Sequence, residues 1–447
     1  MQNYQHSVSL DMDKCKGCTT CLKRCPTEAI RIRDGHAIIN SVRCIDCGEC
    51  IRVCPYKAKK AVHDSLEDMK EYKITVALPA PSLYGQFDNM TSIDYIIDGL
   101  YKLGFDYVFE VACAAEMVSQ YTRMYLKRPD VKKPVISSAC PAITRIINMN
   151  YPFLSEQIMP ILPPIDVAAK LARDRAAARH PELDSSEIGI FFISPCPAKA
   201  SYVKNGFAGD KNNVDRVVSI RDVYFKLIDV MKHDDYPERG ADSGMIGIGW
   251  AATGGESSAV FNDRYLAADG IENCIRVLDQ IDNEDFTDLD FIELNACSGG
   301  CVGGPMTVAN AYIAQARLQS LKRYLPVSPN RPLDKEIPSE YFTDFNVEYD
   351  AGLSLSSDRN EAMRMMADIE SITASLPGLD CGSCGAPTCM AFAEDIVKNE
   401  TNANECTIIM RELFHECLDQ RKAKEIADKL GPFRKNGEDG TKKTNEQ

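Results

Sequence analysis

The chain has 447 residues, of which 45% are hydrophobic and 26% are charged, and its formal net charge is −14. This length can hold one large domain with smaller satellites, because domains usually span about 100 to 200 residues. The negative charge argues against a nucleic-acid partner, since proteins that bind nucleic acids usually carry a basic domain or stripe.

The nineteen cysteines stand in tight clusters along the chain. Such clusters favour metal binding over the disulfide framework of a small secreted protein. The first twelve residues lack the basic and apolar regions of a signal peptide, and no segment offers the roughly 18 consecutive apolar residues of a membrane span. We therefore expect a protein of the reducing cytoplasm without a membrane span.

Residues 1–64 contain one cysteine pattern twice. Each copy reads Cys-x2-Cys-x2-Cys-x3-Cys-Pro, first from Cys15 to Pro26 and then from Cys44 to Pro55. This is the pattern of bacterial two-cluster ferredoxins, in which the fourth cysteine of each copy binds the 4Fe–4S cube of the other copy. The pattern predicts one cube on Cys15, Cys18, Cys21 and Cys54, and a second cube on Cys44, Cys47, Cys50 and Cys25.

Three lysines, Lys57, Lys59 and Lys60, follow the second copy of the pattern. A cube held by four thiolates carries a net charge of about −2, which nearby cations and N–H groups must offset. The lysines could serve that purpose, or they could form an ordinary solvated turn. The sequence leaves both interpretations open.

Residues 72–326 alternate between apolar runs of strand length and amphipathic helical stretches. This alternation predicts parallel sheet with helices on its faces, and hence an α/β fold. Three of the runs end at or just before Cys140, Cys196 and Cys297, and ligands bind at the carboxyl ends of strands in such sheets. The predicted strands are 73–78, 107–112, 133–139, 188–194 and 291–296, and the predicted helices include 93–103, 142–158 and 166–179.

The remainder of the chain divides into three predicted segments. Residues 327–357 open with a proline-rich polar stretch and are expected to be a linker, and the charged tail, residues 421–447, is expected to be disordered. Between them, residues 358–420 are expected to form a small helical iron–sulfur domain. Its cysteine spacing favours one 4Fe–4S cube, although zinc could use the same thiolates. The cysteines are Cys381, Cys384, Cys389 and Cys406.

The central cysteines lie in three segments: SSACP (137–141), SPCPAK (194–199) and ELNACSGGCVGGP (293–305). These segments resemble the three signatures of the iron-only (FeFe) hydrogenase catalytic domain, which implies a two-lobed α/β domain. Two more, APS (80–82) and VFEVACAAE (108–116), resemble further parts of that family. The resemblance covers roughly residues 1–326, and the C-terminal block separately resembles the small 4Fe–4S domain of electron-transport and acetyl-CoA-pathway proteins.

The resemblance implies an H-cluster, in which one thiolate joins a 4Fe–4S cube to a di-iron unit with carbonyl, cyanide and azadithiolate ligands. By position, that thiolate belongs to Cys301, and Lys199 matches the lysine that donates to a cyanide. Glycines around Cys301 are expected to let the backbone approach this cofactor. The four matched ligands are Cys140, Cys196, Cys297 and Cys301, and the matched pocket residues are Ala80, Pro81, Ser82, Ala139, Ser194 and Lys199.

The chain departs from the family along the expected proton path. Hydrogen-producing relatives carry a relay cysteine where this chain has Ala139, which has no proton to transfer. Acidic residues farther along that path correspond to Tyr202 and to positions near Tyr121 and Thr122, and the family's methionine before Pro-Cys is Ser194. The usual relay is therefore expected to be broken.

Two other carboxyl groups are candidates for a substitute path. Buried carboxyl groups can exchange protons near neutral pH, and Glu256 and Glu293 lie in segments expected beside the cofactor pocket. A structural hydrogen bond at a strand end is an equal alternative for Glu293. The isolated cysteines Cys113, Cys274 and Cys417 are expected to be buried hydrophobic residues, and no histidine shows ligand spacing.

The resemblance implies an anaerobic oxidoreductase that interconverts dihydrogen with protons and electrons, in a slow or sensory branch of the family. Four 4Fe–4S clusters would pass electrons to a redox partner, either a ferredoxin or another subunit, and maturation proteins would supply the di-iron unit. The alternative is a non-catalytic electron-transfer subunit or assembly scaffold that keeps the central cube and never receives the di-iron unit.

Overall fold

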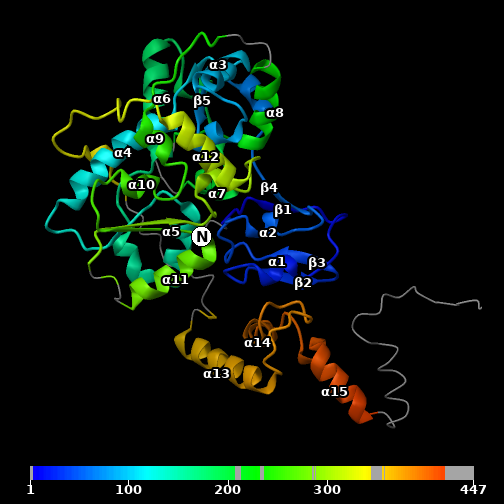
Figure 1. Ribbon diagram of the computed structural model, residues 1–447. Helices are drawn as coiled ribbons and strands as arrows, with labels where there is room; N and C mark the ends of the chain where they lie inside the picture. Colours follow the sequence, from blue (N-terminus) through cyan, green and yellow to red (C-terminus); the bar gives the residue numbers. More distant parts are fainter. Residues whose placement is uncertain are drawn as a thin grey trace, which may run out of the picture. The chain divides into compact units, whose positions relative to one another are not determined.

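The computed structural model describes residues 4–206, 213–231, 236–283, 286, 288–343, 355–356 and 358–417. The chain divides into two compact units, Met1–Ser354 and Leu355–Gln447 (Figure 1). The predicted tail at 421–447 lies outside the described residues, and so do residues 344–354 and 357 of the predicted linker.

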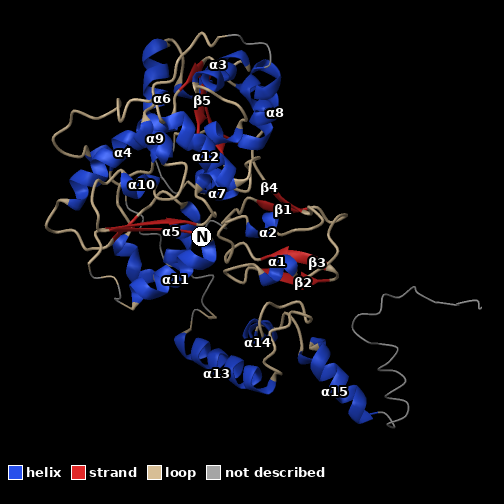
Figure 2. Ribbon diagram, in the orientation of Figure 1, coloured by secondary structure: helices blue, strands red, loops and turns tan. Residues whose placement is uncertain are grey.

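Residues 4–64 form two small antiparallel sheets with one short helix beside each cysteine loop (Figure 2). The loop that joins β2 and β3 is Asp34–Gly35, and both residues have positive φ, as two-residue hairpin turns require. Leu22, Ile30 and Ala37 fill the space between the sheets and the helices. The elements are β1 (Val8–Leu10) paired with β4 (Lys59–Ala61), β2 (Ile30–Arg33) paired with β3 (His36–Ile39), α1 (Thr20–Lys23) and α2 (Glu49–Arg52).

A four-stranded parallel sheet follows, with helices on both faces. Side chains alternate along its central strands, so that Phe192 packs toward α4 and α6 whereas Phe191 packs toward α3 and α8. Figure 1 shows α6 and α8 on opposite sides of β5. The strand order is β6 (Tyr107–Val108), β5 (Ile74–Pro79), β8 (Ile188–Ser194) and β9 (Arg216–Ser219), and the helices are α3 (Asp94–Lys102), α4 (Val111–Leu126), α6 (Pro164–Arg179) and α8 (Ile220–Met231).

A second parallel sheet has three strands and lies against α5 and α11. Ile292 and Leu294 of its central strand pack with Ile143 of α5 and Leu278 of α11. The two parallel sheets confirm the predicted α/β class with two lobes. The elements are β10 (Tyr265–Asp269), β11 (Phe291–Asn295), β7 (Val135–Ile136), α5 (Pro141–Asn150) and α11 (Ile271–Asp282).

The remaining helices connect these layers or form the second unit. None of the described helices combines the length and the apolar character needed to cross a membrane. In the first unit they are α7 (Pro197–Lys204), α9 (Met245–Gly249), α10 (Gly255–Ser258) and α12 (Ala311–Lys322), with short 3-10 helices η1 (Leu66–Glu71), η2 (Pro81–Gln86), η3 (Pro152–Gln157), η4 (Ser185–Glu187), η6 (Cys301–Gly303) and η7 (Ser339–Tyr341). The second unit holds α13 (Arg359–Ser375), α14 (Cys389–Val397), η9 (Ala403–Glu405) and α15 (Thr407–Cys417).

Three element predictions were wrong in their extent. The run predicted as strand 133–139 is a strand only at Val135–Ile136, since only these two residues pair with β11. The run predicted as strand 107–112 is extended only at Tyr107–Val108, and α4 begins at Val111, because its alanines favour a helix. The helix predicted over 142–158 ends at Asn150, since Pro152 cannot continue the helical hydrogen bonds, and η3 replaces its second half.

Part of the predicted linker packs on the first unit. The backbone N–H of Asn330 donates to Glu116 Oε2 at 2.9 Å, and the N–H of Thr343 donates to the Pro160 carbonyl at 3.0 Å. These contacts fix the described residues 327–343 to the first unit, so that this stretch does not behave as a free tether.

Specific contacts dock the N-terminal module on the large α/β part. Arg145 of α5 donates to the Cys44 carbonyl at 2.9 Å, and Ser201 of α7 donates to the buried Asp46 carboxylate at 2.7 Å. Gly48, with φ of +73°, lies against Pro305, where a Cβ would come within 2.3 Å of the proline ring. The backbone at Gly48 and the ring of Pro305 are therefore packed so closely that no side chain fits at Gly48.

Gly48→Ala should destabilise the protein more than Gly35→Ala does. Both glycines have positive φ, so alanine costs about 1–2 kcal/mol at either position for conformation alone. Only Gly48→Ala adds a clash, worth about 1–3 kcal/mol more for overpacking, because nothing lies within 4 Å of a Cβ at Gly35. Thermal unfolding of anaerobic protein measures the difference, and equal midpoints for the two variants would contradict the docking contact.

Candidate metal centres

The N-terminal module brings together cysteines from both copies of the repeat. One pocket is lined by Cys25 of the first copy together with Cys44, Cys47 and Cys50 of the second. Burial raises the pKa of the Cys21 thiol, and the neighbouring Cys18, Cys54 and Cys15 raise it further. The crossed positions of Cys25 and Cys54 therefore agree with the two predicted ligand sets.

Backbone N–H groups donate hydrogen bonds to the sulfur atoms of Cys25 and Cys54, the two cysteines that are predicted to bind the cube of the other repeat. The Ala29 N–H donates to Cys25 Sγ at 3.3 Å, and the Ala58 N–H donates to Cys54 Sγ at 3.2 Å. Burial alone would raise the pKa of Cys54, but N–H groups of residues 56–59 outweigh it and lower that pKa. Because thiolates are the metal-binding form, this geometry favours a metal ligand at Cys54.

In the large α/β part, four thiols converge around one ammonium group. Lys199 of α7 places Nζ 3.8 Å from Cys301 Sγ. Burial works against its charge, but the negative charges of four thiolates prevail and raise the pKa of Lys199. The four are Cys301, Cys196, Cys140 and Cys297, in decreasing order of effect.

The convergence follows from where the strands end. Cys196 caps α7 directly after β8, and Cys140 caps α5 shortly after β7. Cys297 follows β11 by two residues. The carboxyl ends of strands in the two parallel sheets thus deliver three chain-distant thiols to one place, as the sequence predicted.

Burial raises the pKa of every thiol in this group for which a shift is resolved, to about 12 for Cys196. Lys199 lowers the pKa of Cys196, Cys297 and Cys301, but does not overcome burial. A metal must displace these protons, because only a thiolate is a strong ligand. The donor set therefore fits a cationic iron–sulfur centre, and Lys199 supplies positive charge beside it.

Arg52 links the N-terminal module to the central thiols and was not predicted from the sequence. Its Nη2 donates to the Gly303 carbonyl at 2.8 Å, and its guanidinium also contacts Cys297, whose charge raises the pKa of Arg52 against the effect of burial. The charge of Cys47 acts on the same guanidinium. No pattern reveals this role, because the equivalent residue in the first repeat, Lys23, is also basic.

Ala80, Pro81 and Ser82 lie at the carboxyl end of β5, where the Ala80 N–H donates to the Ile193 carbonyl of β8 at 3.3 Å. The Ser82 and Thr253 hydroxyls are buried and have no hydrogen-bond partner among the described residues. A buried polar group without a partner costs free energy, so a bound group could satisfy both hydroxyls. Ser194, in contrast, uses its hydroxyl locally and donates to the Cys196 carbonyl at 3.0 Å.

The glycines around Cys301 have a packing role within the protein. A Cβ on Gly300 would lie 2.6 Å from the Thr253 nitrogen, and a Cβ on Gly304 would lie 2.2 Å from the Pro195 carbonyl oxygen. These glycines allow the Cys301 turn to pack against two other backbone segments. The expectation that they also let the backbone approach the cofactor stays a prediction.

Glu256 and Glu293 form a buried carboxyl pair near the central thiols. Burial raises the pKa of both groups, and the charge of Glu293 raises that of Glu256 further. Glu293 accepts hydrogen bonds from the Gly254 and Ser257 N–H groups at 3.0 and 2.8 Å. These donors stabilise the ionised form of Glu293 and so oppose the rise in its pKa.

A hydroxyl connects Glu256 with the segment that precedes Cys140. Ser137 Oγ donates to Glu256 Oε2 at 2.6 Å and accepts from the Ala139 N–H at 3.1 Å. The carboxyl group therefore lies one hydroxyl away from the backbone of Ala139, the position at which relatives carry the relay cysteine. Sequence analysis singled out Glu256 and Ala139 but missed Ser137, which connects them.

The tyrosines that replace the family's acidic residues are paired with carboxylates from other segments. Tyr121 donates to Asp334 at 2.9 Å, and Tyr202 donates to the buried Asp166 at 2.7 Å. Burial raises the pKa of Asp166 to about 7. The expectation of an outer path without acidic groups was thus too strict, because carboxylates distant in sequence lie beside both tyrosines.

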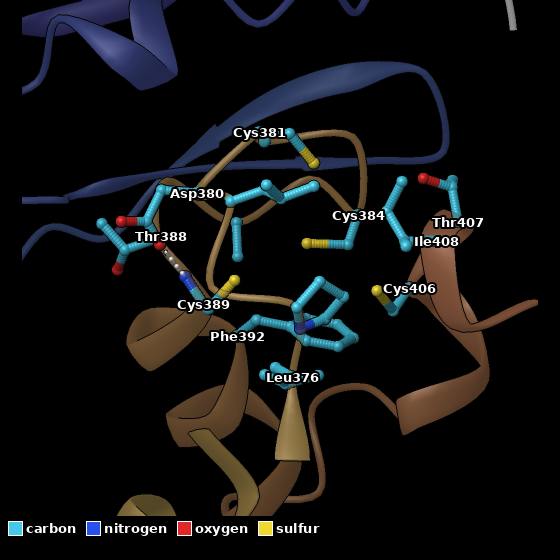
Figure 3. A pocket seen from close by; sticks show the side chains of 14 residues that line it. Leu376, Asp380, Cys381, Cys384, Thr388, Cys389, Phe392, Cys406, Thr407 and Ile408 are labelled. Carbon is cyan, nitrogen blue, oxygen red and sulfur yellow. Dashed lines mark hydrogen bonds between the residues drawn. The ribbon is translucent and has the colours of Figure 1, made fainter. Parts of the chain in front are cut away.

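The second unit contains a pocket lined by four cysteines. Figure 3 shows the sulfur atoms of its four cysteines turned toward a common space, with Leu376 and Phe392 beneath it. Burial raises the pKa of Cys384, and Cys381 and Cys406 raise it further. Asp380 Oδ1 accepts from the Cys389 N–H at 2.6 Å and fixes the start of α14. The four thiols that meet here are Cys381, Cys384, Cys389 and Cys406.

The isolated cysteines and a group around His6 are weaker candidates for metal binding. Cys113 and Cys274 are buried, in agreement with the expected hydrophobic role, whereas the burial of Cys417 lies outside the described residues. His6 lies near Cys44 and Asp46 in a group that could hold a metal ion, which the sequence did not predict. Asp46 is already used as an acceptor by Tyr4, Ser7 and Ser201, so it is a structural hydrogen-bonding centre.

Three family models match the chain. The model described as "Iron only hydrogenase large subunit, C-terminal domain" matches residues 73–305, which is more than half of the chain. A 4Fe-4S dicluster domain model matches residues 7–55, and a model for an Fe–S cluster matches residues 376–408.

Known proteins resemble the chain over about two thirds of its length. It is 26% identical over 362 residues to the periplasmic [Fe] hydrogenase large subunit of Nitratidesulfovibrio vulgaris, covering 67% of this chain and 86% of that protein. It is 22% identical to the NADP-reducing hydrogenase subunit HndD of Solidesulfovibrio fructosivorans, covering 68% and 66%. A solved structure of a HydA1 [FeFe]-hydrogenase variant from Chlamydomonas reinhardtii matches with a TM-score of 0.48 and 16% identity, covering 63% of this chain and 98% of that one.

Anaerobically reconstituted protein should contain about sixteen iron and sixteen sulfide atoms per chain, because sixteen cysteines form four sets of four thiols. Elemental and sulfide analysis tests this count. The variant Cys406→Ser should lose about four iron atoms, whereas the control Cys274→Ser, at a buried cysteine outside the four sets, should lose none. Stoichiometric zinc, or about twelve iron atoms in the unaltered protein, would remove one proposed cube.

Proposed function

We propose, from the premise that this chain belongs to the family of the iron-only hydrogenase C-terminal domain, that it interconverts dihydrogen with protons and electrons. The observation that supports this function best is the convergence of four thiols on Lys199 at the carboxyl ends of the strands. A bare electron-transfer cube needs the four thiols but does not need a half-buried ammonium directed at Cys301.

The residues of the central site fit an H-cluster. Cys140, Cys196 and Cys297 would hold its cube, Cys301 would join the cube to the di-iron unit, and the Lys199 ammonium would orient a cyanide ligand. When bound, the di-iron unit would supply the chemistry that makes and splits the hydrogen–hydrogen bond. The unpartnered hydroxyls of Ser82 and Thr253 provide two more polar contacts for a large group.

Electrons would pass between the central site and the N-terminal module near Arg52. This side chain contacts Cys297 and also feels the charge of Cys47. The cube held by Cys25, Cys44, Cys47 and Cys50 would thus be the neighbour of the central cube, and the cube containing Cys54 would lie farther along the route. The C-terminal cube would offer a second exit toward a ferredoxin or another redox subunit.

Protons would use a substitute route through Ser137 and Glu256. Ala139 offers no side-chain proton, but the Ser137 hydroxyl lies within hydrogen-bond distance of both the Ala139 N–H and Glu256. Burial and the charge of Glu293 raise the pKa of Glu256, which makes its carboxyl group the proton carrier of this proposed route. This indirect route is consistent with a slow or sensory enzyme.

The missing relay thiol also favours the second candidate function. A scaffold or electron-transfer subunit that never receives the di-iron unit would have no use for a proton relay at Ala139. The two candidates differ in whether maturation proteins load the central site. In either case we place the protein in the cytoplasm, where reducing and anaerobic conditions keep such thiols available for iron.

Co-expression with the family's maturation proteins, or loading with a synthetic di-iron mimic, should produce infrared bands of metal-bound carbonyl and cyanide. The four thiols and Lys199 provide the contacts that such a unit needs. The control Cys301→Ser should lack these bands while the N-terminal and C-terminal cubes remain. If the folded protein holds all four cubes but shows no carbonyl or cyanide bands, the hydrogenase function is contradicted and the scaffold function is favoured.

Glu256→Gln should lower hydrogen evolution at least tenfold at matched cofactor loading, since a positioned proton donor contributes about a hundredfold to ten-thousandfold. The infrared bands should remain, because glutamine preserves the shape of the side chain. Glu116→Gln, at another buried glutamate that accepts from the Gly244 N–H, serves as the control and should change the rate little. An unchanged rate in Glu256→Gln would exclude this carboxyl group from the route.

Stability measurements separate this effect from unfolding. The folded protein binds a proton at Glu256 more tightly than the unfolded chain does, because burial raises the pKa of Glu256. Stability must therefore fall as the pH rises above about 4.3, the usual value for glutamate, until the raised pKa is passed. Glu256→Gln should remove the part of this pH-dependent loss of stability that comes from Glu256. The thermal midpoint of the variant at pH 7 should therefore equal or exceed that of the unaltered protein.

A further inference from the structure

The two copies of the repeat in the N-terminal module differ at one buried position, where the second copy carries a lysine. Ile30 and Lys59 each follow the last cysteine of their repeat by five residues, so they occupy equivalent positions. Ile30 is 2% exposed and belongs to the apolar core, and Lys59 is 3% exposed. The second copy thus places an ammonium where the first copy has a hydrocarbon side chain.

The position of Lys59 in its strand explains why it is buried. Lys59 pairs with Leu10 across the β1–β4 ladder, and side chains alternate between the faces of a strand. Lys60, the next residue, points outward and forms an ion pair with Asp11 at 3.0 Å. Figure 1 shows β4 beside β1 and α2 in this module. The inward direction of Lys59 is therefore fixed by the backbone.

The buried ammonium has no hydrogen-bond partner within the described chain. An uncompensated buried charge costs several kcal/mol, so a negative group must lie near it in the functional protein. The nearby anions are thiolates of both predicted sets, because the positive charge of Lys59 lowers the pKa of Cys21 and of Cys50, although burial raises both. The Lys59 N–H also contacts Cys54. Lys59 thus interacts with ligands of two different cubes.

We propose that Lys59 sets the reduction potentials of the two N-terminal cubes, because its buried ammonium acts through its charge on cysteines of both ligand sets. This inference rests on the proposed presence of these two cubes. Reduction adds one negative charge to a cube, and a fixed cation at the boundary stabilises the reduced form more than the oxidised form. Lys59 therefore raises both potentials, and Ile30 provides no matching charge from the other side.

The test replaces the charge and compares neighbouring positions. Lys59→Met keeps much of the length of the side chain without its charge, and Lys59→Ile reproduces the other repeat. Lys60→Met is the matched control, because Lys60 is the adjacent lysine on the exposed face. Iron and sulfide analysis of the full chain first establishes how many cubes each variant holds. Redox titration followed by electron paramagnetic resonance then gives the potential of each cube, and loss of a signal in Cys18→Ser or Cys47→Ser assigns it.

In Lys59→Met and Lys59→Ile, the ratio of reduced to oxidised N-terminal cube at a fixed potential should fall at least tenfold, which corresponds to 59 mV for one electron. The ratio should change less than twofold in Lys60→Met and for the central and C-terminal cubes. Unchanged N-terminal potentials at full iron content would overturn the proposal.

Two further outcomes are distinguishable. If Lys59→Met and Lys59→Ile fail to retain the cubes but Lys59→Arg retains them, the need for positive charge is supported. If Lys59→Arg loses them as well, the role of Lys59 is one of shape and the proposal fails. If the unaltered protein takes up no N-terminal cubes, the proposed cluster function fails instead, and iron analysis reveals this before any potential is measured.

Discussion

The structure depends on holding thiolates, which carry negative charge, inside a folded chain that is already acidic. Sixteen of the nineteen cysteines gather in four sets, and burial raises the pKa of most thiols for which a shift is resolved. Each set in the first unit has a compensating group: Lys59 between the N-terminal sets, and Lys199 and Arg52 beside the central set. The positions of these cations constrain the fold around them, because each must be buried or half-buried to act.

Two levels of organisation bring the charges together. The repeat places the N-terminal thiols by local turn geometry, so those sets need few contacts from elsewhere. The central set instead needs both parallel sheets, because β7, β8 and β11 each end near one of its cysteines. Arg145 and Ser201 then hold the module against the large part, and Arg52 reaches the Gly303 turn beside Cys297. The docking of the module and the completion of the central set are therefore parts of one interface.

The sequence allowed prediction of features that depend on spacing and periodicity. The repeat indicated which cysteines cross between sets, and alternation of apolar runs predicted the α/β class. It could not predict contacts between segments distant in the chain. Ser137 connects Ala139 with Glu256, and Asp166 lies beside Tyr202, only because the strands and helices bring them together. The burial of Lys59 also depends on strand pairing, so the sequence left its role open between a counter-charge and a solvated turn.

The central site combines a cation beside a thiol with a buried acidic pair. Lys199 Nζ lies 3.8 Å from Cys301 Sγ. Near Ala139, which has no side-chain proton to transfer, a buried carboxyl group and a hydroxyl are in hydrogen-bond contact with each other. Placing Glu256 beside Glu293 is costly, because two buried carboxylates repel each other unless one of them holds a proton. This cost supports the proposal that the Glu256 carboxyl group takes part in proton exchange.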